Sequence, residues 1–292
     1  MSTIPRPAAG PLDTSASPHA SWRTLPAGSV TLVGGIWARR QAINRESALP
    51  HGFRMLEEAG NFENLRIAAG RSRATYRGPV FMDSDVYKWV EAASFELARS
   101  PSDELAELVE GAIDVIEAAQ QANGYLNSHY TVAEPGRRWT EFGHGHELYC
   151  AGHLFQAAVA HHRATGSERL LSIARRFADH IDATFGPGKR PATPGHPEVE
   201  TALIELYRET GARRYLDLAG FFVDQRGHGW LGPSARFNSS AYFQDRVPVR
   251  EASEVEGHAV RALYLAVGVA DLYLESGEPA LLRSRSRIEV AT

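Results

Sequence analysis

The chain has 292 residues, of which 43% are apolar and 23% are charged, a composition typical of a globular protein with a sizeable core. Its formal net charge of −4 and its scattered basic residues argue against a nucleic-acid-binding protein. No window approaches the run of about eighteen apolar residues that a membrane-spanning helix needs. We therefore expect neither nucleic acid nor a membrane among its partners. A single cysteine, Cys150, excludes an intrachain disulfide framework, and a cytoplasmic location fits.

The N-terminal part of the chain shows two patterns. Residues 1–27 are rich in Pro, Ala and Ser and lack the apolar run of a secretory signal, which predicts a flexible tail. Residues 30–80 begin with the β-branched stretch VTLV and are then broken by glycine and proline. This second pattern predicts short strands and irregular structure, a small β-rich segment ahead of a helical domain.

From about Asp83 onward the apolar residues recur with the helical period. Hairpins of two helices are predicted at roughly 85–122, 146–185 and 197–227, and half of a further hairpin begins at about residue 254. The last three hairpins open on His146, His196 and His258, and their first helices close at Thr165-Gly166, Thr210-Gly211 and Ser276-Gly277. This is a degenerate internal repeat, and such hairpins stack into a solenoid or close into a ring. If the first helices are parallel, the three histidines gather at one mouth.

The C-terminal end departs from the repeat. After Leu282 the sequence RSRSRIEVAT has no apolar face, although the second helix of the last hairpin should stand there. We expect residues 283–292 to form an irregular tail left by a truncation or a frameshift, because the repeat is cut in mid-hairpin. The other interpretation is a frayed end.

Five long segments, in order, carry a resemblance to a known family. They are DSDVYKWVEA (83–92), AQQANGYLNSHY (119–130), HELYCAGHLFQAAVAHHRATG (146–166), GHPEVETALIELYRETG (195–211) and EVEGHAVRALYLAVGVADLY (254–273). They resemble glycoside hydrolase family 127, the family of β-L-arabinofuranosidases, and the match runs over residues 28–282. The resemblance implies an all-α fold, an (α/α)6 barrel, which is incomplete here because about three and a half of its six hairpins are present.

The resemblance also implies an activity. Family members hydrolyse terminal β-L-arabinofuranosyl residues with retention, so an L-arabinofuranose-containing carbohydrate is the expected partner. In the family a cysteine thiolate bound to zinc is the nucleophile and a glutamate is the acid/base. Those residues lie beyond the end of this chain, which has no glutamate-threonine-cysteine motif and no later cysteine pair. We therefore predict no catalytic residue and no metal ligand in this chain, and we expect it to be inactive alone.

Three histidines are the candidate substrate-binding residues. The resemblance places His146, His196 and His258 at positions that contact the sugar near the scissile bond. Neutral imidazoles can donate hydrogen bonds to sugar hydroxyls or accept them. The alternative is that each histidine caps a helix or satisfies a buried loop. Capping also accounts for most acids near helix starts, such as Glu147 and Glu198. The DSD motif, with Asp83, is predicted to be architectural and to pin a loop to the first barrel helix, with a sugar contact as the further alternative.

The HELYCAGH segment has a further interpretation as a metal site. His146, Cys150 and His153 are spaced i, i+4, i+7 and share one helical face. A straight helix spreads them over about 10 Å, too far for one ion. We predict that Cys150 is a small buried residue, with a substitute nucleophile as the alternative.

Two other functional classes stay open. The hairpins alone also fit a helical-repeat carbohydrate-binding or scaffold module without catalysis. A different (α/α)6 sugar enzyme, such as an unsaturated-uronide hydrolase with an acidic pair, is the third hypothesis. An open barrel edge should expose apolar residues and favour self-association, and the residues concerned are Leu263, Leu265, Val269 and Leu272.

Overall fold

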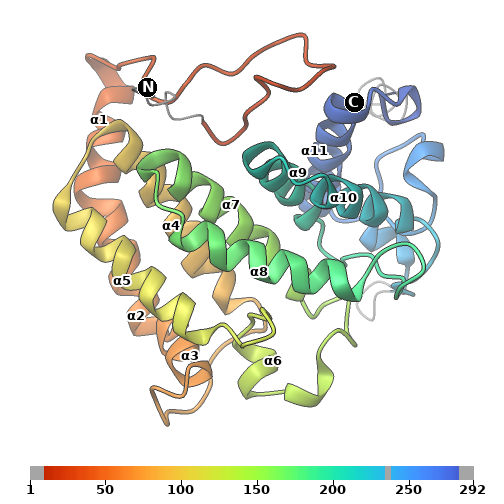
Figure 1. Ribbon diagram of the computed structural model, residues 1–292, viewed down its shortest axis with the longest axis horizontal. Coiled ribbons are helices and arrows are strands. Elements are labelled where there is room, and N and C mark those ends of the chain that lie inside the picture. Colours follow the sequence, from red (N-terminus) through yellow and green to blue (C-terminus); the bar gives the residue numbers. More distant parts are fainter. Residues whose placement is uncertain (1–9, 234–237, 283–292) are drawn as a thin grey trace.

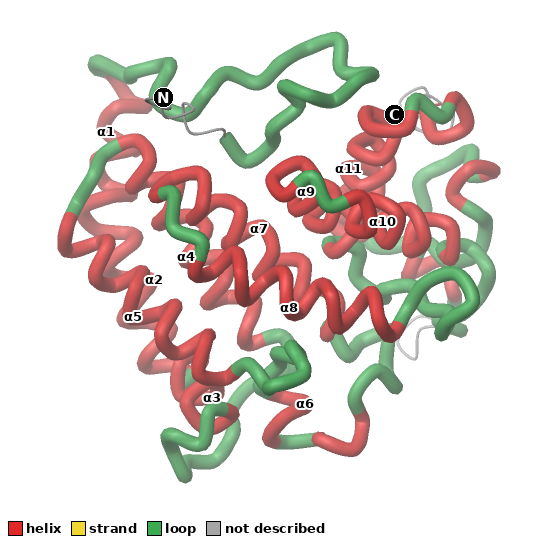
Figure 2. The backbone as a smooth tube through the Cα atoms, in the orientation of Figure 1, coloured by secondary structure: helices red, strands yellow, loops and turns green. Residues whose placement is uncertain are grey.

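The computed structural model describes residues 10–233 and 238–282, and helices dominate it (Figure 1). The α-helices are α1 (Gly35–Ile43), α2 (Leu49–Ala59), α3 (Asn61–Ala68), α4 (Met82–Arg99), α5 (Asp103–Ala119), α6 (His129–Val132), α7 (Glu147–Thr165), α8 (Arg169–Thr184), α9 (Val199–Thr210), α10 (Arg213–Gln225) and α11 (Ala259–Ser276). A π-helical turn, η1 (Asn44–Ala48), joins α1 to α2. Three short 3-10 helices are η2 (Pro135–Arg137), η3 (Ser240–Phe243) and η4 (Val249–Glu251). Figure 2 shows no strand in these ranges, where an isolated bridge joins Phe185 and Arg190.

The predicted β-rich segment at residues 30–80 is wrong, because α1 to α3 occupy most of it. Leu49, Phe53 and Leu56 recur at helical spacing and pack into the hydrophobic core, and this period was hidden among glycines and one proline. Pro50 lies in the first turn of α2, where a helix tolerates the missing amide hydrogen. The helix α2 ends at a glycine with a left-handed backbone.

The predicted hairpins are confirmed. They are the pairs α4 with α5, α7 with α8, and α9 with α10, and α11 is the first helix of the half hairpin. Gly166, Gly211 and Gly277 end α7, α9 and α11, with φ values of 74°, 69° and 68°. Glycine adopts this left-handed conformation without strain, which is why the small-residue–Gly turns marked the helix ends in the sequence.

Four helices line the inner side of the arc: α4 packs on α7, α7 on α9, and α9 on α11. The helix α7 is buried nearly all round, whereas α8 and α10 bury only one face, as outer helices do. Two glycines bring the inner helices together. A Cβ at Gly152 of α7 would lie 2.6 Å from Cγ of Glu198, and one at Gly268 of α11 would lie 2.9 Å from Cβ of Glu200.

The side of α11 that faces away from α9 exposes apolar residues. Leu263 is 67% exposed, and Val260 and Val267 on the same helix are also exposed. The prediction that Val269 and Leu272 would be exposed is wrong, because both are buried on the side of α11 that faces α9 and α10. Self-association through this edge stays a prediction. Among the described helices, none has the length and the apolar character needed to cross a membrane.

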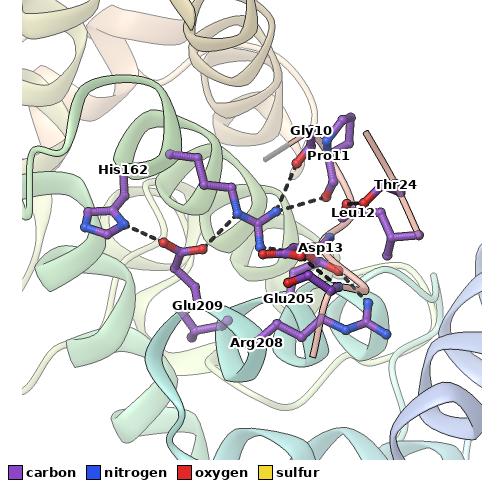
Figure 3. A network of polar contacts seen from close by, with 12 residues as sticks. Gly10, Pro11, Leu12, Asp13, Thr24, His162, Glu205, Arg208 and Glu209 are labelled. Atoms are coloured by element: carbon purple, nitrogen blue, oxygen red, sulfur yellow. Dashed lines mark hydrogen bonds and ion pairs between the residues drawn. The ribbon is translucent and has the colours of Figure 1, made fainter. Parts of the chain in front are cut away.

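The C-terminal ends of the inner helices are tied by buried ion pairs (Figure 3). The guanidinium of Arg163 on α7 lies 2.8 Å from carboxylate oxygens of Glu205 and of Glu209 on α9. Arg208 on α9 pairs in turn with Asp271 on α11, at 2.8 Å. This network joins three inner helices at the end opposite the starts of α7 and α11.

The N-terminal segment runs over these same helix ends, and Figure 3 shows Gly10, Pro11 and Asp13 beside the ion-pair network. The carbonyl oxygen of Gly10 accepts a hydrogen bond from Arg163 at 3.0 Å, and the backbone N–H of Asp13 donates to Glu205 at 3.3 Å. Residues 10–27 therefore have no helix but do have defined contacts, a feature that composition did not indicate. Residues 1–9 and the predicted irregular tail at 283–292 lie outside the described residues.

Candidate functional site

The N-terminal ends of α7, α9 and α11 are held together, so the prediction of one shared mouth is confirmed. The backbone N–H of Gly195, ahead of α9, donates to the carbonyl oxygen of Phe142, ahead of α7, at 2.8 Å. The buried side chain of Arg261 stands in the first turn of α11. Its Nη1 donates to the carbonyl oxygens of Gly143, at 3.2 Å, and of Gly195, at 2.6 Å. Arg261 therefore joins the loops that precede α7 and α9 to the start of α11.

Sequence reasoning missed Arg261. Its guanidinium carbon lies 4.9 Å from the ring centre of Tyr242 and 5.1 Å from that of Phe243, so it is stacked as well as hydrogen-bonded. Burial lowers the pKa of this guanidinium, but arginine starts so far above neutral pH that the group stays charged. One signal in the sequence could have identified Arg261 as a site residue: it lies three residues after His258, on a predicted inner helix.

His146 and His196 lie at this mouth with ring centroids 6.0 Å apart. Nδ1 of His146 is 2.5 Å from the carbonyl oxygen of His144, and Nδ1 of His196 is 2.7 Å from that of Pro197. Because a carbonyl only accepts, each Nδ1 carries the hydrogen and each Nε2 is left as an acceptor. Burial lowers the pKa of His146 to about 4 and that of His196 to about 3, so both rings are uncharged at neutral pH.

His258 stands at the same end as the N-cap of α11. Its Nδ1 accepts a 3.4 Å hydrogen bond from the backbone N–H of Arg261, and its ring lies edge-on to Tyr242 at 5.5 Å. In a neutral imidazole an accepting Nδ1 leaves the hydrogen on Nε2, so His258 presents a donor. His258 therefore caps its helix through its side chain. His146 and Glu198, the N-cap residues of α7 and α9, make no such side-chain hydrogen bond.

A cleft of about 230 Å³ lies between the loops ahead of α7 and α9, and His146, Tyr149 and His196 line it. A larger apolar pocket of about 870 Å³ lies between α11 and residues 244–256, and none of the three histidines lines it. The smaller cleft is the better candidate site, because convergent polar groups rather than size alone characterise a binding site.

Behind this mouth the inner helices add a layer of rings. Tyr149 lies 4.6 Å from His196 and 4.5 Å from His153, between ring centroids, and Tyr264 of α11 lies 5.4 Å from His196. The sequence interpretation assigned neither tyrosine to the site. A signal for Tyr149 was present, because it lies on the same face of α7 as His146 and His153 at i, i+3, i+7.

Cys150 is buried against the first turn of α4, beside Asp83 and Ser84. Burial raises the pKa of this thiol well above its ordinary value, which keeps it protonated at neutral pH. The prediction of a small buried residue is confirmed, and the alternative of an activated nucleophile finds no support. Across residues 10–233 and 238–282, no group of three His, Cys, Asp or Glu side chains is arranged to hold a metal ion. The zinc ion that the resemblance implies therefore has no set of three ligands among these residues.

Two buried acids hold the long loop between α5 and α7. Oδ2 of Asp83 accepts from the backbone N–H of Ser128 at 2.6 Å, and Oδ1 accepts from the hydroxyl of the same residue, so the predicted pinning role is confirmed. Glu147 accepts from the hydroxyl of Tyr125 at 2.5 Å and from the backbone N–H of Trp139 at 2.7 Å. Its carboxyl is therefore a loop anchor and not the predicted helix cap.

Comparisons with known proteins place these features in one family. A family model described as β-L-arabinofuranosidase, GH127 catalytic domain, matches residues 29–289. A non-reducing end β-L-arabinofuranosidase from Bifidobacterium longum subsp. longum is 36% identical over 89% of this chain and 45% of its own length.

Solved structures give the same result. A GH127 β-L-arabinofuranosidase from Geobacillus stearothermophilus T6 matches with a TM-score of 0.86 and 39% identity, over 89% of this chain and 44% of that one. A GH127 β-arabinofuranosidase matches with a TM-score of 0.83 and 35% identity, over 90% of this chain and 42% of that one. The chain thus spans less than half the length of these relatives. Its fold is all-α, of the (α/α)6 type found in these neighbours.

Proposed function

This chain belongs to glycoside hydrolase family 127, and we propose that it forms the sugar-binding part of the active site of a β-L-arabinofuranosidase-like glycoside hydrolase. The proposed substrate is a carbohydrate with terminal β-L-arabinofuranosyl residues, and the proposed reaction of the whole enzyme is hydrolysis with retention. The observation that carries this proposal is the gathering of His146, His196 and His258 at one mouth.

The chemistry of the mouth supports an uncharged, hydroxyl-rich ligand. His146 and His196 present acceptors through Nε2, and His258 presents a donor. Two of these rings are uncharged at neutral pH, so they favour neither an anion nor a cation. A furanose ring carries neighbouring hydroxyls that both donate and accept. This complementarity is the role we assign to the three histidines.

For the chain on its own, the alternative of a carbohydrate-binding module without catalysis has one observation in its favour. The described residues offer neither an activated thiol nor a group of three metal ligands. We propose that these residues bind the sugar and that they do not include the nucleophile. A zinc ion in the whole enzyme stays a proposal from the family, and a cytoplasmic location stays a prediction from the sequence.

The test is calorimetric titration of the chain with methyl β-L-arabinofuranoside, with the α anomer as the matched ligand. We expect the β anomer to bind, and a joint His146→Ala and His196→Ala variant to lose that binding. Equal binding of both anomers, or of neither, would contradict the proposed substrate. Release of p-nitrophenol from the aryl β-L-arabinofuranoside by this chain, with or without added zinc, would contradict the division between binding and chemistry.

A further inference from the structure

A buried carboxyl and a buried imidazole lie behind the mouth. Glu198 is 0% exposed and His153 is 3% exposed. No hydrogen bond reaches either carboxylate oxygen or either ring nitrogen within the described residues. Nδ1 of His153 lies 3.3 Å from Oε1 of Glu198, so the two side chains are in contact, although the two atoms are not aligned for a hydrogen bond. Buried polar groups are nearly always hydrogen-bonded, so an exception of this kind requires an explanation.

The chain makes room for this carboxyl. A Cβ at Gly152 of α7 would lie 2.6 Å from Cγ of Glu198 and 3.0 Å from its carbonyl carbon. The Glu198 side chain therefore lies across α7 in a notch that only glycine leaves open. Glu198 also comes two residues after His196, so the notch fixes the end of the loop that carries that histidine.

Ring contacts connect the pair to the cleft. His153 meets the ring of Tyr149 at 4.5 Å and an interplanar angle of 85°. Tyr149 in turn lies 4.6 Å from His196. Both Tyr149 and His196 line the cleft, whereas His153 and Glu198 do not. The pair can therefore act on a ligand only through these two rings.

The surroundings keep both members of the pair uncharged. Burial raises the pKa of Glu198 well above its ordinary value; Glu91 on α4 and Glu200 on α9 raise it further, and Lys88 on α4 opposes them. Burial lowers the pKa of His153 to about 3, helped by the charge of Lys88 and, once it is protonated, by that of His196. Tyr149 on α7 and Tyr264 on α11 are the other titratable groups facing the pair.

We propose that Glu198 and His153 are positioning residues of the sugar site: the Glu198 carboxyl, seated in the Gly152 notch, fixes the His153 ring, which fixes Tyr149 and, through it, His196. This inference rests on the proposed function of the mouth in binding an uncharged furanoside. An ionised Glu198 would be repelled by Glu91 and would be driven toward water. Ionisation of Glu198 should therefore lower the affinity for the sugar.

The experiment is titration of the chain with methyl β-L-arabinofuranoside between about pH 6 and about pH 9, with the melting temperature of each variant measured in parallel. Glu198→Ala and His153→Phe should each weaken affinity about tenfold or more, an effect of about 1.4 kcal/mol. Glu198→Gln keeps the shape without an ionisable group, so it should retain affinity and remove any decline of affinity with rising pH. His161→Gln is the control, because His161 is a buried imidazole on the same helix that faces Glu110 instead of the cleft.

Two outcomes separate this inference from the proposed function. Unchanged affinity in Glu198→Ala and His153→Phe, with only the melting temperature lowered, overturns the positioning role. If the unsubstituted chain does not bind the furanoside, the proposed function fails, and the imidazole NMR signals of His196 then decide the positioning role. Glu198→Gln or His153→Phe should shift those signals and His161→Gln should not. Signals that stay in place in the first two variants overturn the inference even then.

Discussion

The notch between α7 and α9 offers a substitution whose sign depends on two opposing effects. On helix propensity alone, Gly152→Ala should stabilise the protein by about 1 kcal/mol, because glycine is a poor helix former. The added Cβ, however, would lie 2.6 Å from Cγ of Glu198 and 3.0 Å from the backbone nitrogen of Val199. An ordinary carbon–carbon contact is about 3.5–4.0 Å, so the first contact is about 1 Å too short.

Relieving that contact requires α9 to move away from α7, since one of the two obstacles is backbone. Overpacking of this kind costs about 1–3 kcal/mol, and it also opens the neighbouring core. We therefore expect Gly152→Ala to lower the free energy of unfolding by about 0–2 kcal/mol after the propensity gain is subtracted. The same movement displaces Glu198, so sugar affinity should fall as well.

Gly111 of α5 is the matched control, because no atom lies within 4 Å of the position that its Cβ would take. Gly111→Ala should gain about 1 kcal/mol and leave sugar affinity unchanged. Urea unfolding of the three proteins, analysed with a common m-value, measures the difference. A Gly152→Ala protein stabilised as much as the Gly111→Ala protein would refute the close approach of α7 and α9 at this glycine.

At the opposite end of the arc, Arg163→Ala removes the cation that pairs with Glu205 and Glu209 in a buried network. The free energy of unfolding, measured in urea, should therefore drop by about 3 kcal/mol. A loss below about 1 kcal/mol would mean that this network contributes no more than a surface ion pair. His258→Ala should weaken binding of methyl β-L-arabinofuranoside by about 1–3 kcal/mol, and a lowered melting temperature with unchanged affinity would make this histidine structural. Added zinc should leave the melting temperature unchanged, because the described residues offer no group of three ligands. Stability should fall above about pH 6.5, and Glu147→Gln should reduce that fall.

The hairpins and the shared mouth could be predicted because their signals are local. Apolar residues at helical spacing marked each helix, and Gly166, Gly211 and Gly277 marked helix ends through the backbone conformation that they favour. The prediction of a β-rich segment at residues 30–80 failed because it also relied on local signals. Pro50 and several glycines are helix-breaking signals, and the packing of α2 on α4 overrides them.

The site was predicted less completely, because its remaining members depend on contacts between distant segments. Arg261 donates a hydrogen bond to the carbonyl oxygen of Gly143, a residue 118 positions away. The sequence near either residue gives no local signal for that bond. Glu198 resembled a helix cap in the sequence. Its burial against Gly152 depends on how closely α9 approaches α7, and that distance is a property of the packed helices.

The expected pH dependence of stability arises from two sets of buried groups with opposite shifts. Burial lowers the pKa of several histidines, to about 4 for His146 and to about 3 for His153 and His196. Below about pH 6.5 the unfolded chain therefore binds more protons than the folded one, and the contribution of this set to stability rises with pH until about 6.5. Above that value the histidines contribute no further slope.

Burial raises the pKa of the second set, to about 6 for Asp83 and to about 7 for Glu91 and Glu147. Here the folded chain holds protons that the unfolded chain has released, so stability falls as the pH rises through these values. A shift of the Glu147 pKa from 4.5 to about 7 corresponds to about 3.5 kcal/mol, at about 1.4 kcal/mol per unit. Above about pH 6.5 the carboxyls act alone, and the free energy of unfolding should decline. Because an amide cannot ionise, the Glu147→Gln protein should decline less between about pH 6.5 and 8. Equal slopes would show that the Glu147 carboxyl is already ionised in the folded chain at lower pH.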